Sequence, residues 1–289
     1  MPNVAVVTDS VASIPEDLLD RLQINWVAYF IHRGSDVLRD LVTIQREEFF
    51  GWLPTAREMP QTACPGPGDY LQMYERLVTE QGAREIVSVH MTSIGSGAYQ
   101  AARAAQAMAL EHLPKVRIEV IDTRNAAMAH GWSVIEAARA ALAGLRLDEV
   151  AERVRTLIPL CRMILTADTL RYLYMGGRIG QAARLVGTAL NIKPLIGMED
   201  GVIVALGQAR SRSQAYQKIV EMVESFVGPQ GRVRIAFMHA AAREEAEKLR
   251  TLVEARVTSV ESLIAELSPA LGVHSGPGTA GVCFFPVRD

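Results

Sequence analysis

The stretch that most constrains the fold runs from Glu85 to Ala102 and changes character twice. Residues 85–89 are a short, β-branched apolar run typical of a buried strand, and an alanine-rich helical sequence follows the turn. Between them, residues 92–97 are rich in hydroxyls and glycines. Such a turn leaves unpaired N–H groups and a partial positive charge at the helix start, which favours an anion. An ordinary helix cap at Ser96 explains the same residues equally well, so the turn alone does not distinguish an anion-binding site from a simple helix start.

Strand-like and helical segments alternate along the first half of the chain, a pattern that predicts a parallel sheet covered on both faces. Three of the predicted strands end in hydroxyl or carboxylate residues, at 8–10, 92–93 and 122–123. The carboxyl ends of parallel strands meet at one rim, where open α/β sheets bind their ligands. We therefore predict a ligand site at this rim.

The second half of the chain has a different texture. Residues 199–201 separate two apolar runs and give a strong hairpin signal, and the helices and strands around them suggest an α+β unit. We therefore predict an α/β protein in two parts. Residues 1–160 would form a parallel-sheet α/β/α domain, and residues 161–289 an α+β domain with a mixed sheet.

Two shorter stretches receive predictions of their own. Residues 24–31 are apolar enough to form one continuous strand. Residues 60–68 contain three prolines and two glycines, which preclude a helix and a central strand. We predict an ordered loop there.

Composition excludes several classes of protein. A formal net charge of -2 lacks the basic footprint of a nucleic-acid-binding protein, and no apolar run reaches the roughly 18 residues that span a bilayer. The N-terminus has no basic region of the kind that opens a signal peptide. Cys64, Cys161 and Cys283 are too few and too scattered for a disulfide framework or a zinc site. We expect a cytoplasmic protein without a metal or a nucleic-acid partner, and we leave transient membrane contact open.

Six short motifs, in order along nearly the whole chain, resemble those of the DegV family of bacterial fatty-acid-binding proteins. The first strand ends in an Asp-Ser pair, and the remaining motifs are Thr62-Ala63-Cys64-Pro65, Ser93 to Tyr99, Gly176 to Ile179, Leu190 to Pro194 and His274 to Gly278. The resemblance implies a non-catalytic carrier, the acyl-binding subunit of a bacterial fatty-acid kinase. Such a subunit presents the carboxylate of its lipid to an ATP-binding kinase partner, which forms the acyl phosphate.

The resemblance also implies which residues hold the ligand. One long-chain fatty acid, the only ligand, would occupy a tunnel between the two domains, with Thr62 and Ser93 on its carboxylate. Further carboxylate-binding and cationic residues are expected at Ser96, Gly97, His274, Arg178 and Arg210. Departures from the family pattern at Ala63, Cys64, Gly95 and Ala98 leave the preferred acyl chain open.

Two other functions compete with the carrier. A serine hydrolase could use Ser93 or Ser96 with His274, but neither serine lies in a Gly-x-Ser-x-Gly elbow and no carboxylate is evident to orient the histidine. A self-sufficient kinase would need a Gly-x-x-x-x-Gly-Lys-Ser/Thr loop, which the sequence lacks. The carrier is therefore the preferred hypothesis.

Overall fold

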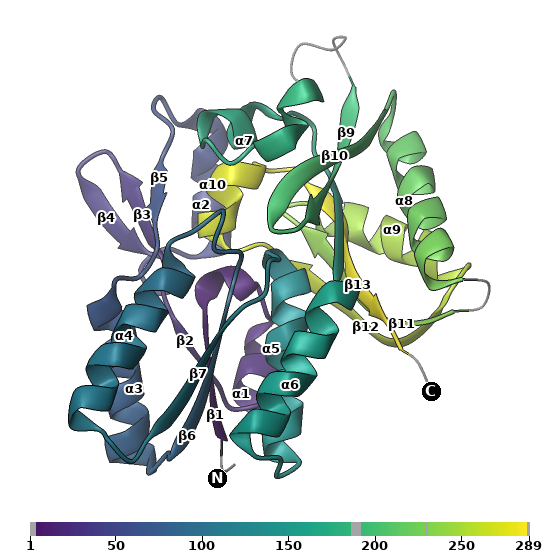
Figure 1. Ribbon diagram of the computed structural model, residues 1–289. Helices are drawn as coiled ribbons and strands as arrows, with labels where there is room; N and C mark the ends of the chain where they lie inside the picture. Colours follow the sequence, from purple (N-terminus) through teal and green to yellow (C-terminus); the bar gives the residue numbers. More distant parts are fainter. Residues whose placement is uncertain (1–3, 186–191, 229–230, 288–289) are drawn as a thin grey trace.

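The computed structural model describes residues 4–185, 192–228 and 231–287 (Figure 1). Two sheets with helices packed on them make up most of these residues. One sheet is parallel and the other is mixed, so the predicted α/β class, with a parallel sheet followed by a mixed one, is confirmed.

The parallel sheet belongs to the first half of the chain. Its strand order is β2-β1-β6-β7, with the bounds Ile24–Val27, Val4–Asp9, Glu85–His90 and Arg117–Asp122. The helices of this half are α1 (Glu16–Arg21), α3 (Pro67–Gln81), α4 (Ala98–His112), α5 (Ala127–Leu142) and α6 (Leu147–Leu157). Helices α3 and α4 lie on one face of the sheet, while α5 and α6 lie on the other (Figure 1). All neighbouring strands run in the same direction, so their carboxyl ends share one rim.

The mixed sheet belongs to the second half. Its order is β10-β9-β8-β13-β11-β12, with the bounds Val202–Ala209, Lys193–Glu199, Arg162–Thr166, Ala280–Pro286, Arg232–His239 and Thr258–Glu266. Strands β9 and β10 form the predicted antiparallel hairpin. Helices α8 (Arg212–Val227) and α9 (Arg243–Glu254) pack on one face of this sheet. Helix α5 reaches its other face, where Trp132 Nε1–H donates to the carbonyl of Cys283 at 2.9 Å.

A small antiparallel sheet and several short helices complete the described residues. The small sheet has the order β4-β3-β5, with the bounds Asp36–Arg39, Phe30–Arg33 and Gln61–Ala63. The short helices are η1 (Ser10–Ala12), α2 (Arg46–Trp52), η2 (Leu53–Thr55), η3 (Ile158–Leu160), α7 (Arg171–Met175), η4 (Gly180–Leu185) and α10 (Pro269–Ser275).

Two of the finer predictions are wrong. Residues 24–31 form two strands in different sheets, because the chain leaves the parallel sheet after Val27 and joins the small sheet at Phe30. The stretch 60–68 contains the edge strand β5 and the start of α3. Its prolines are compatible with both, since β5 lies between Pro60 and Pro65, and Pro67 takes the first helical position, where no N–H is needed.

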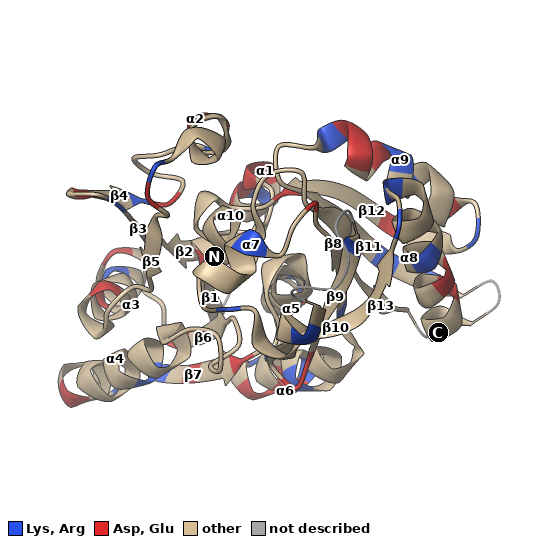
Figure 2. Ribbon diagram, turned by 90° about the horizontal axis from the view of Figure 1, so that it is seen from above, with Lys and Arg blue, Asp and Glu red and all other residues tan. Residues whose placement is uncertain are grey.

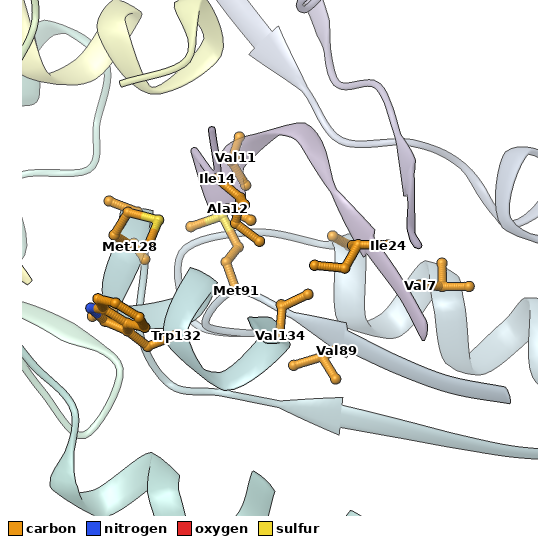
Figure 3. Close-up of a cluster of buried hydrophobic side chains, with 14 of the residues drawn as sticks. Val7, Val11, Ala12, Ile14, Ile24, Val89, Met91, Met128, Trp132 and Val134 are labelled. Carbon is orange, nitrogen blue, oxygen red and sulfur yellow. The ribbon is translucent and has the colours of Figure 1, made fainter. Parts of the chain in front are cut away.

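A continuous apolar core joins the two main sheets. It includes strand residues of both sheets and the buried side of α5, while a second cluster lies under α8 and α9. Figure 3 shows Val11, Ala12, Ile14 and Met91 close together in this core, with Met128 and Trp132 of α5 nearby. Along the chain, β7 is the last strand of the parallel sheet and β8 is the first strand of the mixed sheet. The division into two domains at residue 160 stays a prediction.

Charged residues of both signs are interspersed over the helices (Figure 2), and one group of them is partly buried. Glu136 of α5, only 4% exposed, accepts hydrogen bonds from Arg139, Arg153 and Arg234 at 2.6–2.9 Å. Arg139 also makes a two-point contact with Glu261 of β12 at 2.6 and 2.8 Å. Although burial alone raises the pKa of Glu136, the bonds from Arg153 and Arg139 hold it below its ordinary value. This cluster fixes α5 to the mixed sheet.

We expect Glu136→Ala to lower the free energy of unfolding by about 2–4 kcal/mol, because it leaves partly buried arginines without their shared carboxylate. Glu247, an exposed partner of Arg243 at 3.5 Å, is the matched control, and Glu247→Ala should cost less than about 1 kcal/mol. Urea denaturation of both variants and the parent measures the difference. Equal losses in the two variants would show that the cluster adds nothing beyond surface pairing.

Candidate ligand-binding site

A cavity of about 680 Å³ is lined by segments from both halves of the chain. This volume is typical of sites that enclose a small ligand. Most of the wall is apolar, and its large apolar side chains are Val11, Met91, Ile94, Met163, Leu165, Leu173, Ile196, Met198, Val202, Ile203, Leu267 and Leu271. Val11 and Met91 also belong to the core cluster of Figure 3, so the cavity wall continues directly into the core.

Several polar groups of the wall are connected to one another. The hydroxyl of Thr62 contacts the imidazole of His274, and the hydroxyl of Tyr29 contacts that of Ser96. A Cβ atom at Gly97 would lie 3.2 Å from the Cys64 thiol, so the two contacts lie in neighbouring parts of the wall. Gly97, Gly177 and Arg178 are exposed as well as lining the cavity. The cavity therefore has a polar region that opens to solvent.

The Thr62–His274 contact joins residues far apart in the sequence. Thr62 lies on the edge strand β5 and His274 on α10, and 2.9 Å separates Thr62 Oγ1 from His274 Nε2. The imidazole of His274 fits here because Gly176 has no side chain. A Cβ atom at Gly176 would overlap His274 Nδ1. Burial, together with Arg178 nearby, lowers the pKa of His274 to about 4. The imidazole is therefore neutral at pH 7 and serves as a hydrogen-bonding group, not as a cation.

The Tyr29–Ser96 contact lies at the start of α4. Tyr29 OH and Ser96 Oγ are 2.6 Å apart, and Ser96 Oγ also accepts the backbone N–H of Ala98 at 3.3 Å. Tyr29 is only 5% exposed, and burial, then Asp9, raises the pKa of its phenol well above the ordinary value. The phenol stays protonated and is an available donor at all physiological pH values.

Helix α10, which carries His274, is tied to the first half of the chain by two buried contacts. The carboxylate of Asp40 accepts the N–H of Ala270 at 3.1 Å, and the hydroxyl of Ser13 accepts the N–H of Ser268 at 3.1 Å. Asp40 is fully buried, and burial raises its pKa to about 6, although hydrogen bonds from Ser10, Ala270 and Ser268 act in the opposite direction. Asp40 therefore positions α10 at an energetic cost that depends on pH.

The predicted site residues divide into two groups. Thr62, Ser96, Gly97, Arg178 and His274 line the cavity, and their role in holding a carboxylate stays a prediction. Among the described residues of the wall, Ser93 and Arg210 are absent.

Ser93 and Arg210 make local contacts elsewhere. The N–H of Ser93 donates to Asp122 at 3.2 Å, and the exposed Arg210 donates its backbone N–H to Gln214 at 3.0 Å. In the motif at 190–194, Leu190 and Asn191 lie outside the described residues. Tyr29 lines the cavity but carries no sequence signal, because it lies within the run 24–31 that reads as one continuous strand.

The ends of the parallel strands share one rim, as predicted. The carboxylates of Asp9 and Asp122 at this rim bond to neighbouring residues and do not line the cavity. Asp9 Oδ2 lies 3.0 Å from His90 Nδ1, and His90 Nε2 lies 2.7 Å from the Ser88 hydroxyl, to which Tyr74 donates. These groups are fully or almost fully buried. Asp9 and Asp122 therefore support the loops around the site without lining it.

Two further features of the structure concern metal binding and membrane insertion. Within the described part of the chain, no three His, Cys, Asp or Glu side chains are grouped so as to hold a metal ion. No helix in residues 4–185, 192–228 and 231–287 has both the length and the apolar character needed to cross a membrane.

We expect the stability gained by Asp40→Asn, relative to the parent, to rise with pH. The raised pKa of Asp40 means that the folded state keeps a proton that the unfolded chain loses above about pH 4. The contribution of the protonated Asp40 carboxyl to the stability of the folded protein is therefore complete below pH 4 and lost as pH rises through about 6.

Denaturation at pH 4, 5, 6 and 7 should show the difference between variant and parent growing by about 2 kcal/mol. Asp36→Asn, at an exposed position, is the control and should give a nearly constant difference. A constant difference for Asp40→Asn as well would mean that this carboxyl titrates normally in the folded protein.

Known proteins resemble this chain over nearly its whole length. The family model described as an uncharacterised protein of the DegV family matches residues 3–287. A DegV domain-containing protein of Clostridium perfringens is 31% identical over 281 residues, covering 97% of this chain and 98% of that protein. A DegV domain-containing protein of Streptomyces coelicolor is 34% identical over 281 residues, covering 97% of each chain.

Solved structures agree with this relationship. A DegV family protein from Thermus thermophilus, described by its fatty acid binding, is 28% identical with a TM-score of 0.91, covering 99% of this chain and all of that one. DegV of Bacillus subtilis, described as a fatty acid binding protein, is 25% identical with a TM-score of 0.86 at the same coverage. The family match and the relatives at 30% identity or more establish that the chain belongs to the DegV family.

Proposed function

We propose that this protein binds one long-chain fatty acid in the 680 Å³ cavity and presents its carboxylate to a kinase partner. The observation that carries the proposal is the combination of a mainly apolar wall with connected polar groups where the wall opens to solvent. Family membership, and the fatty acids that related proteins are described as binding, support it.

The head group would lie against Thr62, Ser96 and the backbone at Gly97. His274 has no hydrogen-bond partner for Nδ1 within the described chain, and buried N–H groups without acceptors are rarer than buried acceptors without donors. The proton is therefore best assigned to Nε2, which then donates to Thr62 Oγ1. This assignment frees the Thr62 hydroxyl proton for a carboxylate. Ser96 takes the role that the sequence suggested for Ser93.

The acyl chain would supply most of the affinity. Each buried CH₂ group gains about 0.8 kcal/mol, so a sixteen-carbon chain gains on the order of 10 kcal/mol before ordering costs are deducted. Hydrogen bonds to a charged group add about 1.5–3 kcal/mol each, against the cost of desolvating the carboxylate. Retention of a lipid through purification is consistent with these magnitudes.

The position of the head group favours transfer to a partner over chemistry within this chain. Arg178 is exposed and lines the cavity, so it would face both the carboxylate and an approaching ATP-binding subunit. A cation there would stabilise the added charge of an acyl phosphate. This partner is implied by the family resemblance.

A serine hydrolase finds no support in the same geometry. His274 contacts Thr62, and Ser96 contacts Tyr29, so neither candidate serine has a histidine partner among the described hydrogen bonds. A nucleophilic serine needs a base within hydrogen-bonding reach. We therefore do not propose hydrolysis.

We expect the purified protein to carry close to one equivalent of fatty acid, detectable by mass spectrometry after organic extraction. The double variant Thr62→Ala/Ser96→Ala should bind added fatty acid at least about tenfold more weakly, because two donors to the carboxylate are lost. Ser93→Ala is the matched control and should bind normally, since Ser93 is not part of the described wall.

Two results would count against this assignment. Absence of fatty acid binding in the parent protein would overturn the proposed function. A loss in Ser93→Ala as large as that in the double variant would instead overturn the head-group assignment.

We expect His274→Ala to reduce acyl-phosphate formation by a fatty-acid kinase more than it reduces lipid binding. The imidazole orients Thr62 and lies near Arg178. Its removal should therefore disturb Arg178, the cation proposed to stabilise the negative charge of the acyl phosphate. A reconstituted assay with ATP and the kinase subunit measures the rate. His112→Ala, at an exposed histidine paired with Glu75, is the control, and parallel losses of binding and rate in His274→Ala would contradict the proposed role.

A further inference from the structure

The hydroxyl of Tyr29 is a buried polar group of the cavity wall that the family motifs do not include. The backbone on both sides of it is held in place. The N–H of Tyr29 donates to the Ser10 hydroxyl at 3.1 Å, and its carbonyl accepts the N–H of Asp40 at 2.9 Å. The phenol therefore has a fixed position, and 2.6 Å separates its oxygen from Ser96 Oγ.

The direction of this hydrogen bond follows from the chemistry of the two hydroxyls. A phenol is a stronger acid than an aliphatic alcohol and hence the better donor, so Tyr29 donates and Ser96 accepts. Ser96 Oγ also accepts the N–H of Ala98. With both lone pairs of Ser96 occupied, its own proton has to point in the remaining direction.

We infer that Tyr29 is a positioning residue that fixes the Ser96 hydroxyl as a donor toward the cavity, and so makes the site select a carboxylate over a neutral head group. The inference rests on the proposed function, because it concerns the same cavity. A hydroxyl whose lone pairs are filled by two donors offers only its proton to a ligand. A carboxylate accepts that proton in a charge-assisted bond, whereas an alcohol gains a weaker neutral one.

Electrostatics near Tyr29 make this arrangement matter more. Burial, followed by the nearby Asp9 and to a smaller extent Asp40, raises the pKa of the phenol, so the phenol stays protonated as a donor to Ser96. The same two carboxyl groups oppose a further negative charge, which leaves the oriented hydroxyls and Arg178 to offset them. Removing the phenolic oxygen should therefore affect charged ligands selectively.

The test compares palmitic acid and hexadecanol, which have the same chain length, on the full chain after its lipid has been removed. In Tyr29→Phe we expect the preference for the acid over the alcohol to fall by about tenfold, with hexadecanol binding falling much less than palmitic acid binding. Tyr70→Phe is the matched control, because Tyr70 is also buried, has no hydroxyl partner within the described chain and does not line the cavity.

A double-mutant cycle separates positioning from a general structural role. If Tyr29 acts through Ser96, Tyr29→Phe should change the acid-to-alcohol preference in the parent but not in Ser96→Ala. An undiminished effect in Ser96→Ala, or equal losses for acid and alcohol, would overturn the inference. Failure of the parent to bind palmitic acid would overturn the proposed function itself, so the two failures are distinguishable.

Discussion

The contact between Thr62 and His274 is the constraint on which the candidate site depends. It links an edge strand in the first half of the chain to a short helix near its end, across 212 positions of sequence. Ser13 and Asp40 hold the start of this helix by accepting backbone N–H groups from Ser268 and Ala270. A polar site at this cavity therefore exists only when both halves of the chain are folded and packed together.

Local patterns in the sequence predicted much of the architecture. The hairpin of β9 and β10, the parallel strands and the hydroxyl-rich turn before α4 each depend on a few neighbouring residues, and each forms as expected. Two predictions failed where long-range pairing decides. An apolar run does not reveal that its two ends join different sheets, and β5 is a strand only because β3 lies beside it.

The sequence located many of the residues that line the cavity, but not all of its polar side chains. The turn at 92–97 was identified, yet only the path of its backbone determines that Ser96 and not Ser93 reaches the cavity. Tyr29 could not be found, because its role comes from contacts with residues distant in sequence. The protonation of His274 was equally hidden, since burial among groups that the sequence does not bring together makes it neutral.

Helix α5 also affects the size of the ligand that the proposed site would accept. Ala127, the first residue of α5, and the preceding Ala126 line the cavity, while Trp132 and Glu136 bind the middle of the helix to the mixed sheet. These contacts hold the α5 part of the wall against the mixed sheet. In the proposed binding mode, an acyl chain too long for the enclosed space would push its carboxylate away from Thr62 and Ser96 at the opening, so additional length would lower the affinity.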